Sequence, residues 1–300
     1  MRILIIGSEG FIGKTAAGYF RAKRHEVFCA DIFEKSDPNY FQVSLVEISF
    51  TDLFDRFASL DICINASGAA NVQQSFKDTR RDFQLNTYNV LLIAEAIRKL
   101  QPYCKLINFS SAAVYGDPKQ LPIPETAPLI PLSPYGWHKL MSEQICREYK
   151  EQFDIQTQSL RVFSVYGEGQ KKLLFWDVYQ QVLHSSDNNI ELFGTGNETR
   201  DFMHISDVMR ALDFVVNNGS FDGSAINIAS GIATSIHEAV GIFLAEVAPG
   251  FNICYKGANK QGDPLYWQAD IQKLSALGYT NNVTLNGGLK ATWKWMKEQN

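Results

Sequence analysis

The feature that most constrains the fold of this chain is a glycine-rich turn between a short apolar strand and a helix. The run Arg2–Ile6 is apolar and β-rich, and Lys14–Ala22 has the composition of a helix. The segment Gly7-Ser8-Glu9-Gly10-Phe11-Ile12-Gly13 joins them. Strand, glycine turn and helix in this order are typical of a βα unit that binds a dinucleotide, and a plain βα turn is the alternative.

The three glycines each have an expected role in such a turn. Gly7 would allow the tight bend, Gly10 would let the backbone approach a pyrophosphate, and Gly13 would let the helix pack closely on the strand. The N–H groups at the start of the helix would face the phosphate charge. We therefore expect Gly7, Gly10, Phe11, Ile12 and Gly13 to form a cofactor-binding segment.

Asp31 follows the second predicted strand, Glu26–Ala30, at the distance from the glycine turn that is typical of a ribose-binding carboxylate. A carboxylate there accepts hydrogen bonds from the adenine-ribose hydroxyls and repels a 2′-phosphate. Ile32 comes next, and no arginine follows that would hold such a phosphate. The sequence therefore favours NAD over NADP. The alternative role for Asp31 is that it only caps the start of a helix.

Further apolar runs predict the rest of a parallel sheet. Ala66 and Ser67 follow one of these runs, and such small residues would let a cofactor lie close to the backbone. Alternating strands and helices predict an α/β fold with a Rossmann-like, doubly wound parallel sheet, in which ligands bind at the carboxyl ends of the strands. The remaining predicted strands are Phe41–Ile48, Asp61–Asn65 and Lys105–Phe109, and a long amphipathic helix is predicted over Asp82–Leu100.

Tyr135 and Lys139 are the main candidates for chemistry. Four residues apart on a helix, they would lie on one face with Cβ atoms about 5–6 Å apart. A lysine ammonium beside a phenol favours the phenolate, so we expect Lys139 to lower the pKa of Tyr135. The Tyr-x-x-x-Lys spacing occurs in many helices by chance, and it gains weight here from the glycine turn and the Ser110-Ser111 pair.

Together these motifs resemble the extended short-chain dehydrogenase/reductase family, in its nucleotide-sugar epimerase and dehydratase branch. The resemblance covers nearly the whole chain and does not specify one substrate. It is carried by Gly7-x-x-Gly10-Phe11-Ile12-Gly13, Ser110–Gly116, Ser133-Pro134-Tyr135-x-x-x-Lys139, Leu160–Gly167, Arg200-Asp201-Phe202, Gly262-Asp263-Pro264 and the Leu285…Trp293 ending.

The resemblance implies a role for each matching residue. Tyr135 would take a proton from a sugar hydroxyl as hydride leaves the same carbon for NAD⁺. Lys139 would assist Tyr135 and hold the nicotinamide ribose. Ser111 would bond the reacting oxygen, although it could instead cap the strand end.

Four further residues are implied to bind substrate. Asn86 would lie near the sugar, unless it is only a polar residue on a helix face. Arg200 would grip the pyrophosphate, and a surface ion pair with Asp201 or Asp207 is the alternative. Ser164 and Lys260 stand where relatives often have Asn and Arg that contact phosphate.

The reaction class follows from what the site lacks. Sugar 4,6-dehydratases of this family carry acidic residues where this chain has Ala112-Ala113, so dehydration is disfavoured. Hydride transfer at one hydroxyl carbon remains, either in an NAD-dependent nucleotide-sugar 4-epimerase, which works through a 4-keto sugar, or in an NAD(P)H-dependent 4-ketoreductase of a 4-keto-6-deoxy sugar nucleotide. Asp31 favours the epimerase. A catalytically silent NAD-binding protein is a third hypothesis.

The expected organisation is a larger NAD-binding domain followed by a smaller, mixed α/β substrate domain. The NAD-binding domain would cover residues 1–165, with probable returns near 204–230, and the nucleotide-sugar domain would cover 166–203 and 231–300. Residues 231–245 and 270–295 are predicted to be mostly helical. The family implies a homodimer through a four-helix bundle built from residues 82–100 and 135–150.

Composition excludes several other classes. A net charge of −4 without a Lys/Arg block argues against nucleic-acid or membrane-surface binding. No apolar run approaches the ~18 residues of a membrane span. The five cysteines are scattered without a Cys-x-x-Cys pair, so no metal is expected and reduced thiols in the cytoplasm are favoured.

Overall fold

The structure is a computed structural model that describes residues 1–43, 49–258 and 261–299. Its larger lobe is built on a seven-stranded sheet in the order β10-β6-β5-β4-β1-β2-β3, and all the neighbouring strands are parallel. The strand order changes direction between β1 and β4, which is where doubly wound sheets bind ligands. The strands are β1 (Arg2–Ile6), β2 (Glu26–Asp31), β3 (Tyr40–Gln42), β4 (Ile62–Asn65), β5 (Lys105–Ser111), β6 (Thr157–Val162) and β10 (Asp222–Ile228).

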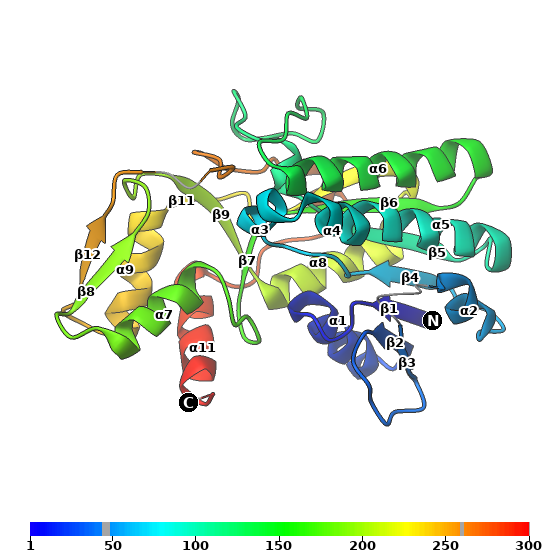
Figure 1. Ribbon diagram of the computed structural model, residues 1–300, viewed down its shortest axis with the longest axis horizontal. Coiled ribbons are helices and arrows are strands. Elements are labelled where there is room, and N and C mark those ends of the chain that lie inside the picture. The colour runs from blue at the N-terminus through cyan, green and yellow to red at the C-terminus, as the bar shows by residue number, and fades with distance from the viewer. Residues whose placement is uncertain (44–48, 259–260, 300) are drawn as a thin grey trace.

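Helices cover both faces of this sheet, which explains why strands such as β1, β2 and β4 are mostly apolar. On β1, Ile3 and Ile5 pack toward one face, with α1 (Phe11–Ala22) and α8 (Ile205–Asn218). Leu4 and Ile6 pack toward the other face, because successive side chains of a strand alternate. The second face is covered by α2 (Phe50–Asp55), α5 (Asn89–Leu100) and α6 (Pro134–Phe153) (Figure 1).

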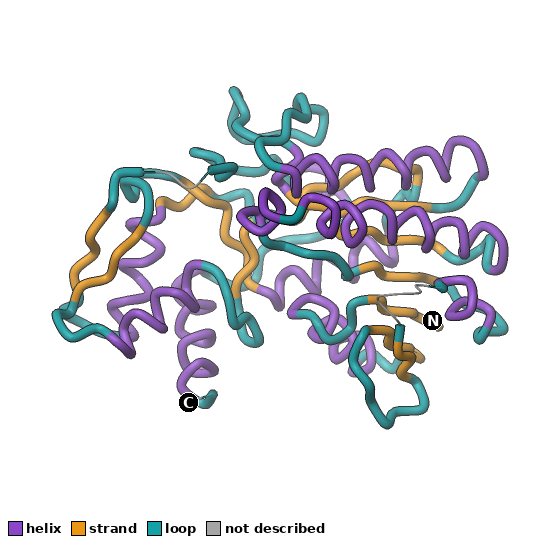
Figure 2. Tube along the Cα trace, viewed as in Figure 1, coloured by secondary structure: helices purple, strands orange, loops and turns teal. Residues whose placement is uncertain are grey.

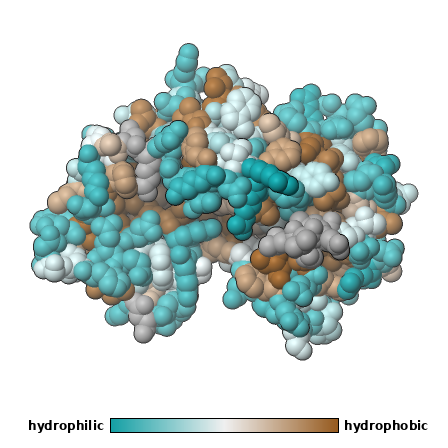
Figure 3. Space-filling model, in the orientation of Figure 1, coloured by the Kyte–Doolittle hydropathy of each residue, from teal (hydrophilic) through white to brown (hydrophobic). Residues whose placement is uncertain are grey.

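The smaller lobe has its own apolar core and its own short sheets (Figures 1 and 2). One sheet has the order β11-β9-β7 and the other pairs β12 with β8. Figure 3 shows a notch between the two lobes at the lower edge of the view. The elements of this lobe are β7 (Ser164–Tyr166), α7 (Leu174–His184), β8 (Asn189–Leu192), β9 (Thr199–His204), β11 (Ala233–Ser235), α9 (Ile236–Val247), β12 (Asn252–Tyr255) and α11 (Leu285–Lys297).

Several predicted boundaries need correction. The helix expected over Asp82–Leu100 is interrupted: α4 (Thr79–Phe83) passes into a π-helical turn, η1 (Gln84–Tyr88), before α5 begins. The 231–245 segment starts as β11 before α9, and the 270–295 segment holds two separate helices, α10 (Gln272–Ala276) and α11. The third predicted strand, Phe41–Ile48, corresponds to β3, which ends at Gln42; Val43 is not in a strand, and residues 44–48 lie outside the described residues. A short helix, α3 (Val72–Lys77), was not predicted.

Two further properties concern the described residues only. None of their helices is long and apolar enough to cross a membrane, and none of their His, Cys, Asp and Glu side chains form a group of three that could hold a metal ion. The five cysteines are free thiols, and Cys254 alone among them is exposed.

Candidate active site

The glycine turn is packed so closely that side chains are excluded from it. Gly7 has φ +81°, and a Cβ on it would lie 2.6 Å from the backbone nitrogen of Ser67. A Cβ on Gly13 would lie 2.1 Å from the carbonyl oxygen of Gly7. These contacts bring the turn after β1 against Ala66 and Ser67 at the end of β4, on the two sides of the switch point.

The start of α1 and the end of β2 fit a dinucleotide. The helix begins after Gly10, which has no side chain to cap the first N–H groups, so a phosphate can accept from them. The two carboxylate oxygens of Asp31 accept from the backbone N–H groups of Glu9 at 2.8 Å and Ile32 at 2.7 Å. Each oxygen keeps a second lone pair for a ribose hydroxyl. Asp31 thus ties the glycine turn to β2, and no helix follows it that it could cap.

Tyr135 and Lys139 lie on one face of α6, as predicted, and both are buried. The helix starts at Pro134, after Ser133, whose hydroxyl accepts from the N–H of Gly136 at 3.1 Å. The Lys139 ammonium donates to the carbonyl oxygen of Phe109 on β5 at 2.8 Å. Its Nζ atom lies 6.0 Å from the ring centroid of Tyr135. The cap and the carbonyl therefore fix both side chains at the carboxyl end of β5.

Burial dominates the proton affinities of this pair. It raises the pKa of Tyr135 to about 12, while a hydrogen bond with Ser111 acts to lower it. Burial also lowers the pKa of Lys139 to about 8, against the negative charge of Asp82. The groups of the protein itself therefore do not produce the expected fall in the pKa of Tyr135, because loss of water outweighs the effect of Ser111 and the negative charge of Asp82 raises the pKa further.

Ser111 caps the strand end, which is one of the two roles considered for it. It is the last residue of β5, and its Oγ accepts from the N–H of Ala113 at 3.2 Å, which caps the 3₁₀ turn η2 (Ala112–Val114). The same side chain acts on Tyr135, whose pKa it lowers against the larger effect of burial. Ala112 is fully buried in this turn. Because residues 112 and 113 are both alanine, the positions that carry acids in dehydratases offer no acid here.

Asn86 faces the same region from the π-helical turn. Its amide nitrogen donates to the carbonyl oxygen of Ala69 at 3.0 Å, and its buried Oδ1 has no hydrogen-bond partner among the described residues. A Cβ on Gly68 would lie 2.5 Å from this Oδ1 and 3.4 Å from the Nζ of Lys139. Gly68, at φ +122°, thus leaves no room for a side chain beside this amide oxygen, and it brings Asn86 and Lys139 to the same stretch of backbone.

A chain of hydrogen-bonded polar side chains between β4, β5 and α6 was not predicted. Asn65 accepts from the hydroxyl of Ser67 at 2.6 Å and donates to Asn108 at 3.0 Å. Asn108 donates to Ser142 at 3.1 Å, and Ser142 donates to the carbonyl oxygen of Lys139 at 2.7 Å. The chain joins the end of β4 to the helical turn that carries Lys139. Its signal in the sequence is an asparagine inside each of two apolar strands.

Arg200 and Ser164 come from the smaller lobe. Arg200, on β9, donates to the carbonyl oxygens of Thr199 at 2.9 Å and Leu265 at 3.3 Å, and burial lowers its pKa. The predicted alternative, an ion pair with Asp201 or Asp207, is wrong. Asp201 accepts from backbone N–H groups and from Ser230, and Asp207 pairs with Arg210 at 2.9 Å. Ser164 begins β7 beside β9, and Lys260 lies outside the described residues.

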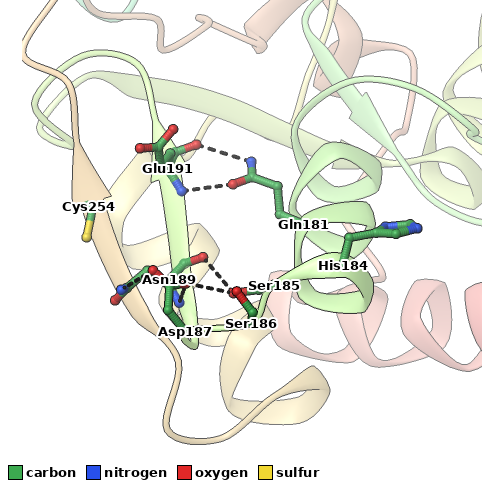
Figure 4. Close-up of a pocket in the computed structure, with 8 residues that line it drawn as sticks. All are labelled: Gln181, His184, Ser185, Ser186, Asp187, Asn189, Glu191 and Cys254. Carbon is green, nitrogen blue, oxygen red and sulfur yellow. Dashed lines mark hydrogen bonds between the residues drawn. The ribbon is translucent and has the colours of Figure 1, made fainter.

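A separate surface hollow lies in the smaller lobe, between the end of α7 and the strands β8 and β12 (Figure 4). Its polar groups satisfy one another: the Gln181 side chain donates to and accepts from the backbone of Glu191, and Ser185 donates to Asp187 at 3.0 Å. In Figure 4 the imidazole of His184 points away from the acidic side chains. We therefore regard this hollow as surface relief and not as the site of chemistry.

Comparison with known proteins supports the cofactor and the reaction class. A family model described as the NAD-dependent epimerase/dehydratase family matches residues 3–229. The UDP-glucose 4-epimerase of Mycolicibacterium smegmatis is 28% identical, over 79% of this chain and 80% of that protein. The UDP-glucuronic acid 4-epimerase of Bacillus cereus, solved with UDP-glucuronic acid and NAD, is 26% identical, with 100% of both chains covered and a TM-score of 0.89.

A third similar protein has been solved with two different sugar nucleotides. MoeE5, in complex with UDP-glucuronic acid and NAD, is 25% identical, with 100% of both chains covered and a TM-score of 0.88. It has also been solved with UDP-glucose and NAD. The Bacillus cereus protein and MoeE5 have thus both been solved with NAD and a UDP-sugar, and MoeE5 with two different sugars.

Proposed function

The chain belongs to the NAD-dependent epimerase/dehydratase family, and we propose that it is an NAD-dependent nucleotide-sugar 4-epimerase. One observation carries the choice of reaction. Tyr135, Lys139 and Ser111 meet at the carboxyl end of β5, while the two residues after Ser111 are alanines. This set supports proton and hydride exchange at one carbon, and it contains no acid for dehydration.

The residues of the chain divide the proton chemistry between them. The glycine turn and Asp31 would hold NAD, which would supply a hydride acceptor for C4 of the sugar and, once reduced, a hydride donor to the 4-keto carbon. Tyr135 takes the proton of the 4-hydroxyl in the first half and gives a proton back to the 4-oxygen in the second, so the cycle uses no net proton. Ser111 forms a hydrogen bond to the same 4-oxygen and keeps the phenol of Tyr135 in place. Lys139 supplies a fixed positive charge beside both groups.

We propose a UDP-sugar as the substrate, because the similar proteins above are named for UDP-sugars or bind them. Arg200 would hold the diphosphate, for which a guanidinium is suited by its paired N–H donors. We assign residues 1–165 and 204–230 to cofactor binding, and 166–203 and 231–300 to the sugar nucleotide. We place the enzyme in the cytoplasm, where thiols stay reduced.

The function is tested by analysing what the purified protein carries and converts. Denaturation followed by mass spectrometry should release NAD, because an epimerase recycles its cofactor in place. Incubation with UDP-glucose, UDP-glucuronic acid and UDP-N-acetylglucosamine, followed by proton NMR, should show the 4-epimer of at least one of them without added nucleotide. Conversion only when NADPH is added, with a 4-keto-6-deoxy sugar as substrate, would instead establish the ketoreductase.

We also propose that the enzyme is a homodimer through the outer faces of α4–α5 and α6. Four large apolar side chains are exposed there: Phe83 (40%), Tyr88 (41%), Trp137 (47%) and Met141 (42%). Exposed apolar patches of this kind mark protein interfaces. We expect Met141→Asp to convert the dimer into a monomer, measured by size-exclusion chromatography with light scattering.

A matched control for this substitution lies on the other lobe. Leu183 on α7 is 48% exposed, close to the exposure of Met141. Leu183→Asp adds the same charge at an unrelated surface and should leave the mass unchanged. A wild-type protein that is monomeric at micromolar concentration, or a Met141→Asp variant that stays dimeric, would contradict this interface.

A further inference from the structure

A buried carboxylate and imidazole lie beside the reacting residues, and the proposed reaction does not use them. Asp82 on α4 and His138 on α6 are joined by an Oδ2–Nδ1 contact of 2.6 Å, and their side chains are only 4% and 8% exposed. His138 directly precedes Lys139. Because a buried pair of this kind contributes little net stability over well-packed apolar residues, its presence calls for another explanation.

His138 connects two helical segments at more than one point. Its carbonyl oxygen accepts from the hydroxyl of Thr87 at 2.9 Å. Its ring meets the edge of Phe83, with centroids 5.5 Å apart and planes at 79°. Together with the Asp82 contact, these contacts hold the segment from the end of α4 through η1 against the catalytic turn of α6, which is the turn that carries Tyr135 and Lys139. The held segment carries Asn86, whose Oδ1 has no hydrogen-bond partner among the described residues and lies, like the Nζ of Lys139, close to Gly68.

Asp82 also supplies negative charge to the reacting pair. The acidic groups that act on Lys139 are Asp82 from α4, then Glu143 and last Cys146 from α6 itself, and burial raises the pKa of the Cys146 thiol to about 12. Glu143 is bound to the buried guanidinium of Arg161 at 2.7 Å, so its charge is largely balanced. The β5 neighbour of Lys139 is the neutral carbonyl of Phe109. Asp82 is therefore the main counter-charge of Lys139, and it acts on Tyr135 as well.

We propose that Asp82 and His138 form a positioning unit of this active site, which holds the Asn86-bearing π-helical turn against the catalytic turn of α6 and balances the charge of Lys139. This inference rests on the proposed epimerase reaction, since it assigns the unit to the proton transfers at C4. The two residues act through Tyr135, Lys139 and Asn86 and do not touch the substrate.

The charge-balancing part is tested with Asp82→Asn, which keeps the shape and removes the charge. Without that anion, both Lys139 and Tyr135 lose their protons more easily. Both limbs of the pH profile of kcat should therefore move to lower pH, by about one unit. A merely structural role would lower kcat at every pH without moving the limbs. Asp213→Asn removes a carboxylate from the surface pair that Asp213 makes with Lys23, and it should leave the profile unchanged.

The positioning part is tested by comparing two substitutions of His138. His138→Ala removes the bond to Asp82, and kcat should fall about tenfold with little change in KM, since the diphosphate is held elsewhere. His138→Gln can still donate to Asp82 and should recover most of the lost kcat. A readout that does not depend on turnover is the resistance of η1 to hydrogen exchange, which should fall in His138→Ala and recover in His138→Gln.

The outcomes separate this inference from the proposed function. A wild-type protein that epimerises no UDP-sugar refutes the function, whatever the exchange data show. A wild-type protein that does epimerise, with an Asp82→Asn profile at the wild-type position or a His138→Gln variant as impaired as His138→Ala, refutes the positioning unit alone.

Discussion

Replacing Tyr135 by phenylalanine is expected to lower kcat by roughly 10³-fold, because the substitution removes the general acid and base of the proposed reaction. The ring is buried and packed, and phenylalanine fills the same space without the hydroxyl. The variant should therefore fold, melt within a few degrees of the wild type and still release NAD on denaturation. Proton NMR of the UDP-sugar conversion measures the loss, and mass spectrometry of the denatured variant measures the cofactor.

A second tyrosine provides the control for this prediction. Tyr179 is buried in the smaller lobe, where its hydroxyl donates to the carbonyl oxygen of Met296 at 3.4 Å. Tyr179→Phe removes a buried hydroxyl of the same kind far from β5 and should keep turnover near the wild-type level. A Tyr135→Phe variant that retains more than about a tenth of the wild-type kcat would show that another group moves the proton.

Five of the seven strands of the larger lobe were predicted in whole or in part from their apolar pattern, and β6 and β10 were not. Arg2–Ile6 is observed with the predicted bounds, and the other predicted strands that the structure describes in full differ by one or two residues. Both faces of the sheet are buried, so β1, β2 and β4 are mostly apolar, whereas β6 and β10 carry several polar residues. The glycine turn was predictable for a similar reason, because Gly7 and Gly13 occupy positions where no Cβ fits and only glycine is compatible with the fold.

The π-helical turn at Gln84–Tyr88 could not be predicted from periodicity. Apolar side chains keep a helical spacing on both sides of it, and one wider turn shifts the register too little to break the pattern. The consequence is functional, because the turn determines where Asn86 lies. The Asn65–Asn108 bond was hidden for a related reason: the two residues face each other only once β4 and β5 are aligned.

The pKa of Tyr135 shows a further limit of sequence-based inference. The Tyr-x-x-x-Lys spacing identifies a favourable charge, and it carries no information on how much water the fold removes. In the structure, burial has the larger effect on both side chains. The residues that take part were therefore predictable, while the balance of their proton affinities depends on packing by segments far apart in the sequence, such as α4 and β5.

Replacing Lys139 by methionine is expected to have two opposite effects. Turnover should fall by about 10²-fold or more, because the fixed charge beside the reacting oxygen is lost. The free energy of unfolding at pH 7 should nevertheless rise, because methionine fills the space of the buried side chain and needs no hydration. Lys139 is 6% exposed, and burial lowers its pKa from 10.5 to about 8.

The sign and size of the stability effect follow from linkage between folding and proton binding. Below pH 8 the folded protein holds a buried ammonium, and a shift from 10.5 to about 8 corresponds to a destabilisation of about 3 kcal/mol. Methionine removes this effect but leaves the carbonyl oxygen of Phe109 without its donor, which offsets about 1–2 kcal/mol. The expected net gain at pH 7 is therefore about 1–2 kcal/mol.

The pH dependence distinguishes this explanation from a generally better-packed variant. As the pH rises from about 8 toward 10.5, Lys139 is neutral in the folded protein while the unfolded chain still binds the proton, so the wild type gains stability. The variant lacks this group, and its advantage should shrink and then reverse over that range. Urea unfolding of both proteins at pH 7 and pH 10 isolates Lys139, since the other titrating groups are common to both. An advantage that stays constant between the two pH values, or a variant that is less stable at pH 7, would show that the burial of a charge at Lys139 does not oppose folding.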